Sequence, residues 1–374
     1  MNTQLGRPEV VHALKAAIAQ SAEQMITFRD YMNICLYNEP GGYYRNEEPK
    51  IGKAGDFYTS SSIGTVMGDM VAAFLEKRTR VPDDPDERIH LVEWGGGNGR
   101  MALHVLDELR LIAPDLYSRL SYTMIESSSY HRRLQRETLQ THADVLTFME
   151  EQAWFAQPPQ DHLYVIANEL LDAFPVQRMR YQQEQWQQSY VVWNEDDQTF
   201  SEIWRSLQDS RLLDDLQGMN VQWVDGQIAE INTAAAAWIE AVMNRMHSGS
   251  LLVIDYGDRQ EELYAPHRHN GTLMCYRRHQ AHDNPFIYQG EQDVTSHVNF
   301  TACKQTASMS GADEVSLQTQ REFLLDQGIL HKLQNHFDRN PFSDVSKRNR
   351  AIRQLLVSDQ MSELFKVLIA TKKK

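Results

Sequence analysis

The sequence predicts a doubly wound α/β fold, and two observations support this prediction. First, short apolar runs of strand length alternate along the middle of the chain with segments of helical periodicity, a pattern typical of parallel sheets with right-handed crossovers. Second, a glycine-rich turn at Gly95–Gly99 joins one apolar run to the helical segment that follows it. The chain has 374 residues, more than one ordinary domain needs, so we expect additional segments around the α/β core.

The α/β core is predicted over residues 81–175 and 225–374. Its strands are the apolar runs at residues 89–94, 122–125, 163–167 and 251–254. The spacing of apolar residues predicts helices at 101–109, 130–140 and 227–246. Further strands and helices are expected within 316–325 and 360–370.

Two segments are expected outside this core. Residues 1–80 predict an N-terminal helical extension with a glycine-rich loop at 51–62 and helices at 8–19, 26–36 and 64–77. Residues 176–224 break the alternation of strands and helices, because they are rich in Gln and aromatic residues. They predict an inserted lobe that begins with a hairpin over 176–193.

Composition and charge argue against several classes of protein. Hydrophobic residues make up 41% of the chain and charged residues 24%, as in ordinary globular proteins. The three cysteines are far apart in the sequence, so neither a disulfide framework nor a metal site is expected. The net charge of −14 argues against nucleic acid as a partner and weakly favours a basic one.

Targeting and membrane segments are not expected. The N-terminal sequence lacks a basic region followed by an apolar run, and it lacks the bias of a transit peptide. No stretch of about 18 apolar residues occurs that could span a membrane. These features predict a cytoplasmic protein that does not enter a membrane, and they leave the oligomeric state open.

The glycine-rich turn has three interpretations. Gly95-x-Gly97-x-Gly99 fits the pattern of adenosylmethionine sites, whereas Gly97-x-Gly99-x-x-Ala102 fits the dinucleotide pattern equally well. The third interpretation is a tight turn without a ligand. Glu93, which lies just before the turn, belongs to the same predicted ligand site.

Glu126 supports a nucleoside ligand. It lies at the predicted end of the next strand, where a carboxylate can accept both hydroxyls of a ribose. The alternative is a surface carboxylate that caps the helix beginning near Ser127–Ser129.

A third polar group follows the strand at 163–167. Asn168, Glu169 and Asp172 would lie at the ligand-binding edge of the sheet, where they could orient a nucleophile for a direct displacement. Two carboxylates three residues apart could clamp a guanidinium group through paired hydrogen bonds. The alternative is that Asp172 caps a helix and Glu169 is solvated.

Several separate segments, in the same order, resemble one family, the MidA-like class I S-adenosylmethionine-dependent methyltransferases. This family includes the mitochondrial arginine methyltransferase of complex I assembly. The matching segments extend from about residue 26 to 301 and include Pro40-Gly41-Gly42-Tyr43-Tyr44, Gly55-Asp56-Phe57-Tyr58-Thr59-Ser60, Gly95–Gly99, Asn168-Glu169-Leu170-Leu171-Asp172-Ala173-Phe174-Pro175, Ile254-Asp255-Tyr256-Gly257 and Asp293-Val294-Thr295.

The resemblance implies a Rossmann-like class I methyltransferase sheet with S-adenosyl-L-methionine as the cofactor. It implies that the cofactor is held by the glycines of the turn together with Glu93 and Glu126. It also implies roles near the active site for Gly55, Asp56, Thr59, Asn168, Glu169 and Asp172, and we expect the loop at 52–62 to close over the cofactor. Two departures leave the substrate in doubt: Gly96, Asn98 and Arg100 replace the residues usual in the first loop, and Asn299 stands where the family usually has Asp.

Four functions remain open at this point. A methyltransferase acting on a protein, with an arginine side chain as acceptor, is the leading hypothesis. A small-molecule methyltransferase and an assembly factor that binds adenosylmethionine without catalysis are alternatives. An NAD-linked oxidoreductase is favoured only by the second glycine pattern.

Overall fold

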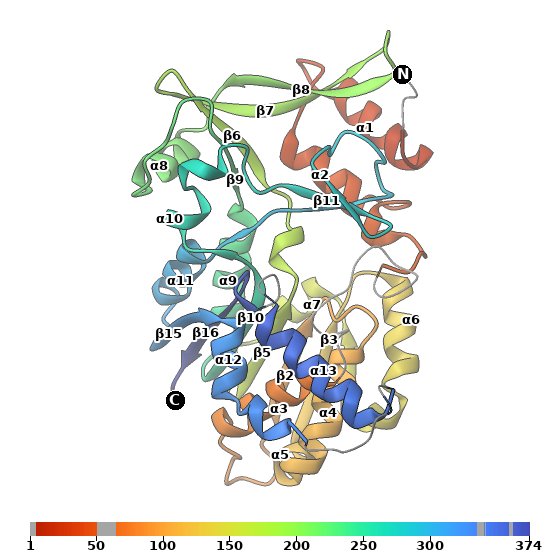
Figure 1. Ribbon diagram of the computed structural model, residues 1–374, viewed down its shortest axis with the longest axis vertical. Helices are drawn as coiled ribbons and strands as arrows, with labels where there is room; N and C mark the ends of the chain where they lie inside the picture. Colours follow the sequence, from red (N-terminus) through yellow and green to blue (C-terminus); the bar gives the residue numbers. More distant parts are fainter. Residues whose placement is uncertain (1–4, 51–64, 335–339, 341, 359–361) are drawn as a thin grey trace.

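The computed structural model describes residues 5–50, 65–334, 340, 342–358 and 362–374. In this part of the chain the strands form an eight-stranded, a five-stranded and a three-stranded sheet. The eight-stranded sheet occupies the lower half of Figure 1, and the five-stranded sheet lies above it beside the first two helices.

The eight-stranded sheet confirms the predicted α/β fold. Its order is β15–β16–β10–β5–β2–β3–β4, with the short β14 beside β10. The strands from β4 to β10 run parallel, whereas β16 is antiparallel to both β10 and β15. The bounds are β2 (Ile89–Trp94), β3 (Leu120–Ile125), β4 (Leu146–Met149), β5 (Leu163–Asn168), β10 (Gly249–Asp258), β14 (Val298–Asn299), β15 (Glu314–Thr319) and β16 (Phe365–Lys372).

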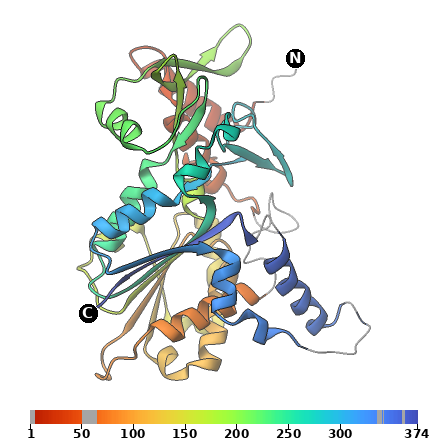
Figure 2. The same ribbon diagram turned by 60° about the vertical axis from the view of Figure 1, so that its left-hand side comes forward.

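Helices cover both faces of this sheet (Figure 2). Tyr164 and Ile166 of β5 pack in one core with α3 (Val66–Arg78) and α4 (Arg100–Ile112), whereas the alternate residues of the strand pack in the other core with α9 (Thr233–Met243) and α11 (Phe300–Met309). Strands that are buried on both faces have continuous apolar sequences. This double burial explains why these strands could be predicted from the sequence.

The five-stranded sheet is antiparallel throughout. It has the order β1–β7–β6–β9 with β8 on β7, and the bounds are β1 (Ile26–Thr27), β6 (Gln177–Gln182), β7 (Gln185–Asn194), β8 (Thr199–Ser206) and β9 (Ile228–Ile231). The hairpin predicted over 176–193 is confirmed. Its turn residues, Gln183 and Glu184, have φ values of 51° and 60°, as a two-residue type I′ turn requires.

The single helix predicted over 227–246 is wrong. The segment begins with β9, which pairs with β6, and the helix α9 starts only at Thr233. Asn232 separates the two elements, because its side chain accepts a hydrogen bond from the N–H of Ala235 and caps the helix. The five-stranded sheet thus includes strands from outside 176–224, and the boundaries of the predicted insertion stay a prediction.

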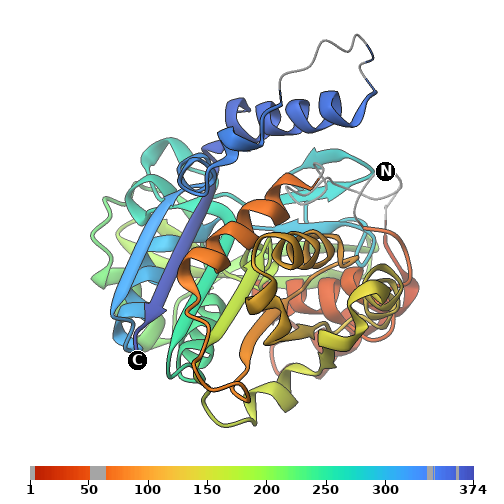
Figure 3. The ribbon, with the colours of Figure 1, turned by 90° about the horizontal axis from the view of Figure 1, so that it is seen from below.

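The other elements surround these two sheets. α1 (Pro8–Gln20) and α2 (Phe28–Tyr37) pack on the five-stranded sheet, and α13 (Asp344–Val357) projects from the body of the molecule (Figure 3). The three-stranded sheet consists of β11 (Met274–Arg277), β12 (Gln280–His282) and β13 (Asp293–Thr295). The remaining α-helices are α5 (Pro114–Ser118), α6 (Ser129–Thr138), α7 (Glu151–Phe155), α8 (Ser210–Gly218), α10 (Gln260–Leu263) and α12 (Gln320–Asp326). Among the described residues, no helix combines the length and the apolar character needed to cross a membrane.

Candidate active site

A cavity of about 140 Å³ lies at the carboxyl ends of β2, β3 and β5. Its walls bring together residues predicted from three separate parts of the sequence. These are Glu93 with the glycine turn up to Asn98, Glu126, and Asn168 with Glu169. The strand order explains why these residues lie close together, because β2 lies between β3 and β5 in the sheet.

Glycine is required in the turn for two physical reasons. A Cβ atom on Gly96 would lie 2.5 Å from the Met124 Cε atom and 3.1 Å from the Glu93 carboxyl carbon. Gly97 has a φ of 52°, in the left-handed region that residues with side chains disfavour. The turn therefore presents bare backbone to the cavity.

Glu126 is buried, not a surface residue. It accepts hydrogen bonds from the N–H of Ser128 (2.8 Å) and from the Gln135 side-chain amide (3.4 Å). The helix cap itself is the Ser128 hydroxyl, which accepts a hydrogen bond from the N–H of His131. Burial raises the pKa of Glu126 to about 7.

Gln135 and Glu93 complete this wall of the site. The fully buried Gln135 amide also donates to the Gly97 carbonyl at 2.9 Å, and its Oε1 atom has no partner among the described residues. Glu93 accepts a hydrogen bond of 2.7 Å from the Tyr122 hydroxyl, and burial raises the pKa of Glu93 to about 7. Acidic and polar groups are therefore buried around the cavity with hydrogen-bonding capacity left over.

Glu169 and Asn168 form the opposite end of the cavity wall. The Glu169 carboxylate accepts hydrogen bonds of 3.3 Å from both the Asn168 amide and the Tyr256 hydroxyl. Asp172 lies in the buried turn Leu171–Ala173 and is not among the residues that line the cavity. Burial raises the pKa of Asp172 well above its ordinary value, and the nearby carboxylates of Asp255 and Asp293 add to the effect.

Aromatic residues from the N-terminal region also line the cavity. Tyr37 and Tyr44 are stacked, with ring centroids 5.6 Å apart and an interplanar angle of 21°. The Tyr44 hydroxyl donates to both carboxylate oxygens of Asp293, at 2.8 and 2.9 Å, and the Tyr37 hydroxyl donates to the Ala173 carbonyl at 2.9 Å. The sequence indicated Tyr44 only as part of the segment Pro40-Gly41-Gly42-Tyr43-Tyr44 that resembles the family.

Two basic side chains of the site had no signal in the sequence. Lys50 is buried against the ring of Tyr43, with its Nζ atom 4.5 Å from the ring centroid, and donates to the Asn46 side chain. His131 lies on α6, and burial lowers the pKa of this imidazole to about 4. Both line the cavity.

Three predicted site residues, Gly55, Asp56 and Thr59, lie outside the described residues. The same holds for the loop at 52–62 that was expected to close over the cofactor. Their roles stay predictions.

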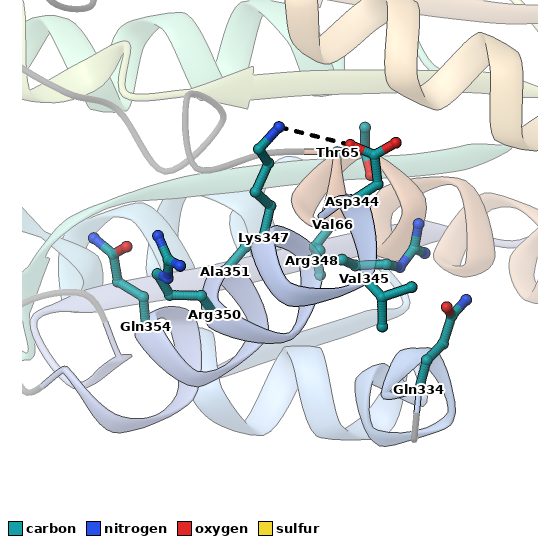
Figure 4. A pocket seen from close by; sticks show the side chains of 10 residues that line it. All are labelled: Thr65, Val66, Gln334, Asp344, Val345, Lys347, Arg348, Arg350, Ala351 and Gln354. Carbon is teal, nitrogen blue, oxygen red and sulfur yellow. Dashed lines mark ion pairs between the residues drawn. The ribbon is translucent and has the colours of Figure 1, made fainter. Parts of the chain in front are cut away.

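A second hollow lies between α13 and the start of α3 (Figure 4). Its lining includes Lys347, Arg348 and Arg350, with an ion pair of 3.6 Å between Lys347 and Asp344. It shares no lining residue with the strand-end cavity among the described residues. The glycine turn therefore lines the strand-end cavity and not this second hollow. In the described part of the chain, no cluster of three or more His, Cys, Asp or Glu residues could hold a metal ion.

Comparison with known proteins identifies the family. Residues 70–317 match the model of a family of S-adenosyl-L-methionine-dependent methyltransferases. A Burkholderia thailandensis protein crystallised with S-adenosyl-homocysteine has a TM-score of 0.84 and 28% identity, over 99% of this chain and 95% of that one. A native crystal structure, also from Burkholderia thailandensis, gives a TM-score of 0.82 at 28% identity, over 99% and 95% of the two chains.

The curated relatives are mitochondrial proteins by name. The "Protein arginine methyltransferase NDUFAF7 homolog, mitochondrial" of Drosophila melanogaster is 25% identical over 82% of this chain and 71% of its own length. The Xenopus tropicalis protein of the corresponding name is 24% identical over 91% of this chain and 81% of its own length. The predicted cytoplasmic location is wrong by this comparison.

The comparisons also decide between the two glycine patterns. The family and the neighbour crystallised with S-adenosyl-homocysteine show that adenosylmethionine is the cofactor, and they exclude the NAD-linked oxidoreductase. The chain belongs to the MidA-like family of S-adenosylmethionine-dependent methyltransferases and is an enzyme of that class.

Proposed function

We propose that this enzyme methylates an arginine side chain of a partner protein, and that the strand-end cavity holds both the cofactor and the acceptor nitrogen. One observation carries the proposal. The carboxylate of Glu169 lines the same cavity as the glycine turn and Glu126. The names of the curated relatives support arginine as the acceptor.

The residues of the cavity fit an adenosyl cofactor. The buried Glu126 carboxylate suits the two hydroxyls of a ribose, and the Gln135 amide behind it holds Glu126 and the Gly97 carbonyl in place. The bare backbone of Gly95, Gly96 and Gly97 admits a close ligand, and Glu93 supplies a further buried carboxyl group. Gly99, also predicted for this site, is not among the lining residues and lies against Gln135 and Leu139. When bound, adenosylmethionine supplies an electrophilic methyl group.

Glu169 and Asn168 are proposed to handle the acceptor. The two oxygens of Glu169 would accept hydrogen bonds from guanidinium N–H groups and so orient the planar group. Glu169 would then take up the proton that the methylated nitrogen releases. The Asn168 amide holds the Glu169 side chain at 3.3 Å, whereas the raised pKa of the buried Asp172 favours its neutral form.

The overall charge of the chain fits a basic partner. A net charge of −14 raises the rate at which positively charged surfaces meet the enzyme, and salt reduces this effect. The stacked rings of Tyr37 and Tyr44 offer a flat apolar wall, of the kind on which guanidinium groups stack.

Mass spectrometry of strains with and without the gene tests the proposal. Arginine methylation should disappear from at least one protein in the deletion strain. The purified chain should restore methylation to that protein with labelled adenosylmethionine, because Glu169 and the cofactor face one cavity. Glu169→Gln should lower the transfer rate at least a hundredfold and leave S-adenosylhomocysteine affinity within about twofold, since a positioned general base contributes roughly 10²–10⁴-fold.

A matched control separates this effect from a general loss of charge. Glu184→Gln removes a carboxylate from the exposed hairpin turn and should leave both transfer and affinity unchanged. Loss of methylation only from small molecules in the deletion strain would contradict the protein substrate. Full activity of Glu169→Gln would remove this residue from the mechanism.

A further inference from the structure

A carboxylate outside the cavity holds the chain segment that carries Glu169. Asp255 lies near the end of β10, is fully buried and does not line the cavity. Its Oδ2 atom accepts hydrogen bonds from three successive backbone N–H groups, those of Leu170 (3.1 Å), Leu171 (2.8 Å) and Asp172 (3.3 Å). Burial raises the pKa of Asp255 to about 7, and the hydrogen bonds that it accepts from backbone N–H groups oppose this rise.

The segment needs such an anchor because its conformation is unfavourable. Glu169 has a φ of 52°, in the left-handed region that residues other than glycine seldom occupy. Its own N–H donates to the Ile254 carbonyl at 2.8 Å, so β10 binds the turn on both sides of the strained residue. Such strain persists only where surrounding contacts hold the backbone in place.

The neighbour of Asp255 holds the Glu169 side chain as well. The second oxygen of Asp255, Oδ1, accepts a hydrogen bond of 2.9 Å from the N–H of Tyr256. The Tyr256 hydroxyl in turn donates to the Glu169 carboxylate at 3.3 Å. Two adjacent residues of β10 thereby control both the backbone and the carboxylate of Glu169.

We propose that Asp255 is a positioning residue for methyl transfer: by collecting the three N–H groups, it keeps Glu169 in its left-handed turn with the carboxylate at the cavity. The inference rests on the proposed function, because Glu169 is the residue assigned to the acceptor. Asp255 itself touches neither cofactor nor acceptor, so its removal acts through the geometry of residues 168–173.

Amide hydrogen exchange of the Asp255→Asn variant tests the anchor directly. The peptide covering residues 168–173 should exchange at least tenfold faster than in the wild-type protein, because a neutral amide replaces the carboxylate that binds three N–H groups. Binding of S-adenosylhomocysteine, measured by calorimetry, should stay within about twofold of wild type. An unchanged exchange rate of this peptide would overturn the proposal. A fold-loss of S-adenosylhomocysteine affinity as large as the fold-increase in exchange rate would also overturn it.

Asp258→Asn is the matched control. Asp258 lies on the same strand, and its carboxylate pairs with Lys366 at 3.3 Å instead of with the turn. This variant should leave exchange of residues 168–173 unchanged. If Asp255→Asn does not fold, the wild-type protein decides: amides of residues 170–172 that exchange as slowly as those of β10 support the anchor, and amides that exchange freely overturn it.

Kinetics distinguish this inference from the proposed function. With a protein substrate that the wild type methylates, Asp255→Asn should lower kcat at least tenfold and leave the KM for adenosylmethionine unchanged. A wild-type enzyme that methylates no arginine would end the proposed function, and the exchange experiment would still decide whether Asp255 holds the turn.

Discussion

Two buried carboxyl groups of this site, those of Glu93 and Glu126, have raised pKa values. Glu93 and Glu126 both line the cavity, and burial raises the pKa of each from the ordinary 4.5 to about 7. Because the folded-state pKa is raised, the stability that each group contributes is fully present below about pH 4.5 and is lost as the pH rises through about 7. The fold thus gives up stability to keep ionisable groups at the cavity.

Cofactor affinity should depend on pH through Glu126. If the ionised form accepts the ribose hydroxyls, the Kd for S-adenosylhomocysteine should fall roughly tenfold between pH 6 and pH 8, as linkage to one group requires. Glu126→Gln should remove this dependence and weaken binding at pH 8 by about 1.5–3 kcal/mol, the range for hydrogen bonds to a charged partner. Calorimetry across this pH range measures both effects.

Glu93→Gln decides which of the two carboxyl groups titrates, because burial raises the pKa of both to about 7. This variant should keep the slope of the wild-type profile. A flat profile in Glu93→Gln together with a wild-type profile in Glu126→Gln would assign the titration to Glu93 and contradict the role of Glu126.

The sequence predicted the position of Glu126 but could not decide what it does. A carboxylate two residues before the helix could cap that helix or face a ligand, and both uses need the same place in the chain. Its role depends on Gln135, which lies within α6, nine residues after Glu126. The Gln135 amide donates to both the Glu126 carboxylate and the Gly97 carbonyl. That contact is set by tertiary packing, which local pattern does not contain.

At the scale of the element, four core strands (β2, β3, β5 and β10) could be predicted, whereas β4 and β9 could not. β5 and β10 are apolar on both faces because helices cover both sides of the sheet. β9 is short, and the Ala-rich segment that follows it extends the helical pattern back over it. Its strand conformation comes from pairing with β6, which lies about fifty residues earlier in the chain.

A partly buried ion pair joins α13 to α3, beside the apolar contacts that Ala351, Ile352 and Leu355 make with the core. Arg348 of α13 contacts Asp69 of α3 at 2.6 Å, and Asp69 is only 4% exposed. Burial raises the pKa of Asp69, and the charge of Arg348 opposes this effect. Removing the arginine would leave a carboxyl group buried without its cation.

Arg348→Ala should therefore destabilise the protein by about 1–3 kcal/mol, between the values for exposed and fully buried pairs. Denaturant unfolding measures the change. Lys347→Ala is the control, since its pair with Asp344 is exposed and should contribute less than about 0.5 kcal/mol. Equal effects of the two substitutions would mean that the Arg348 contact does not hold α13.

At the scale of the whole molecule, the site combines parts that are distant in the sequence. The glycine turn, Glu126 and Glu169 follow three parallel strands, so the strand pattern alone predicts that they meet. Tyr37, Tyr44 and Lys50 come from the N-terminal region, which no periodicity places beside the sheet. The resemblance to the family pointed to Asp255 and Asp293, but their contacts could be assigned only from the structure.

The central claim is that adenosylmethionine binds against the glycine turn of this fold. Titration of S-adenosylhomocysteine into the wild-type protein and into Gly97→Val tests it most directly. Gly97 lines the cavity with a φ of 52°, so a branched side chain would both strain the turn and occupy the space of the ligand. Gly218→Val is the control, because a Cβ at Gly218 meets no atom within 4 Å. Heat of binding is expected for the wild type and Gly218→Val and none for folded Gly97→Val. Unchanged affinity in folded Gly97→Val would contradict binding of the cofactor against the glycine turn.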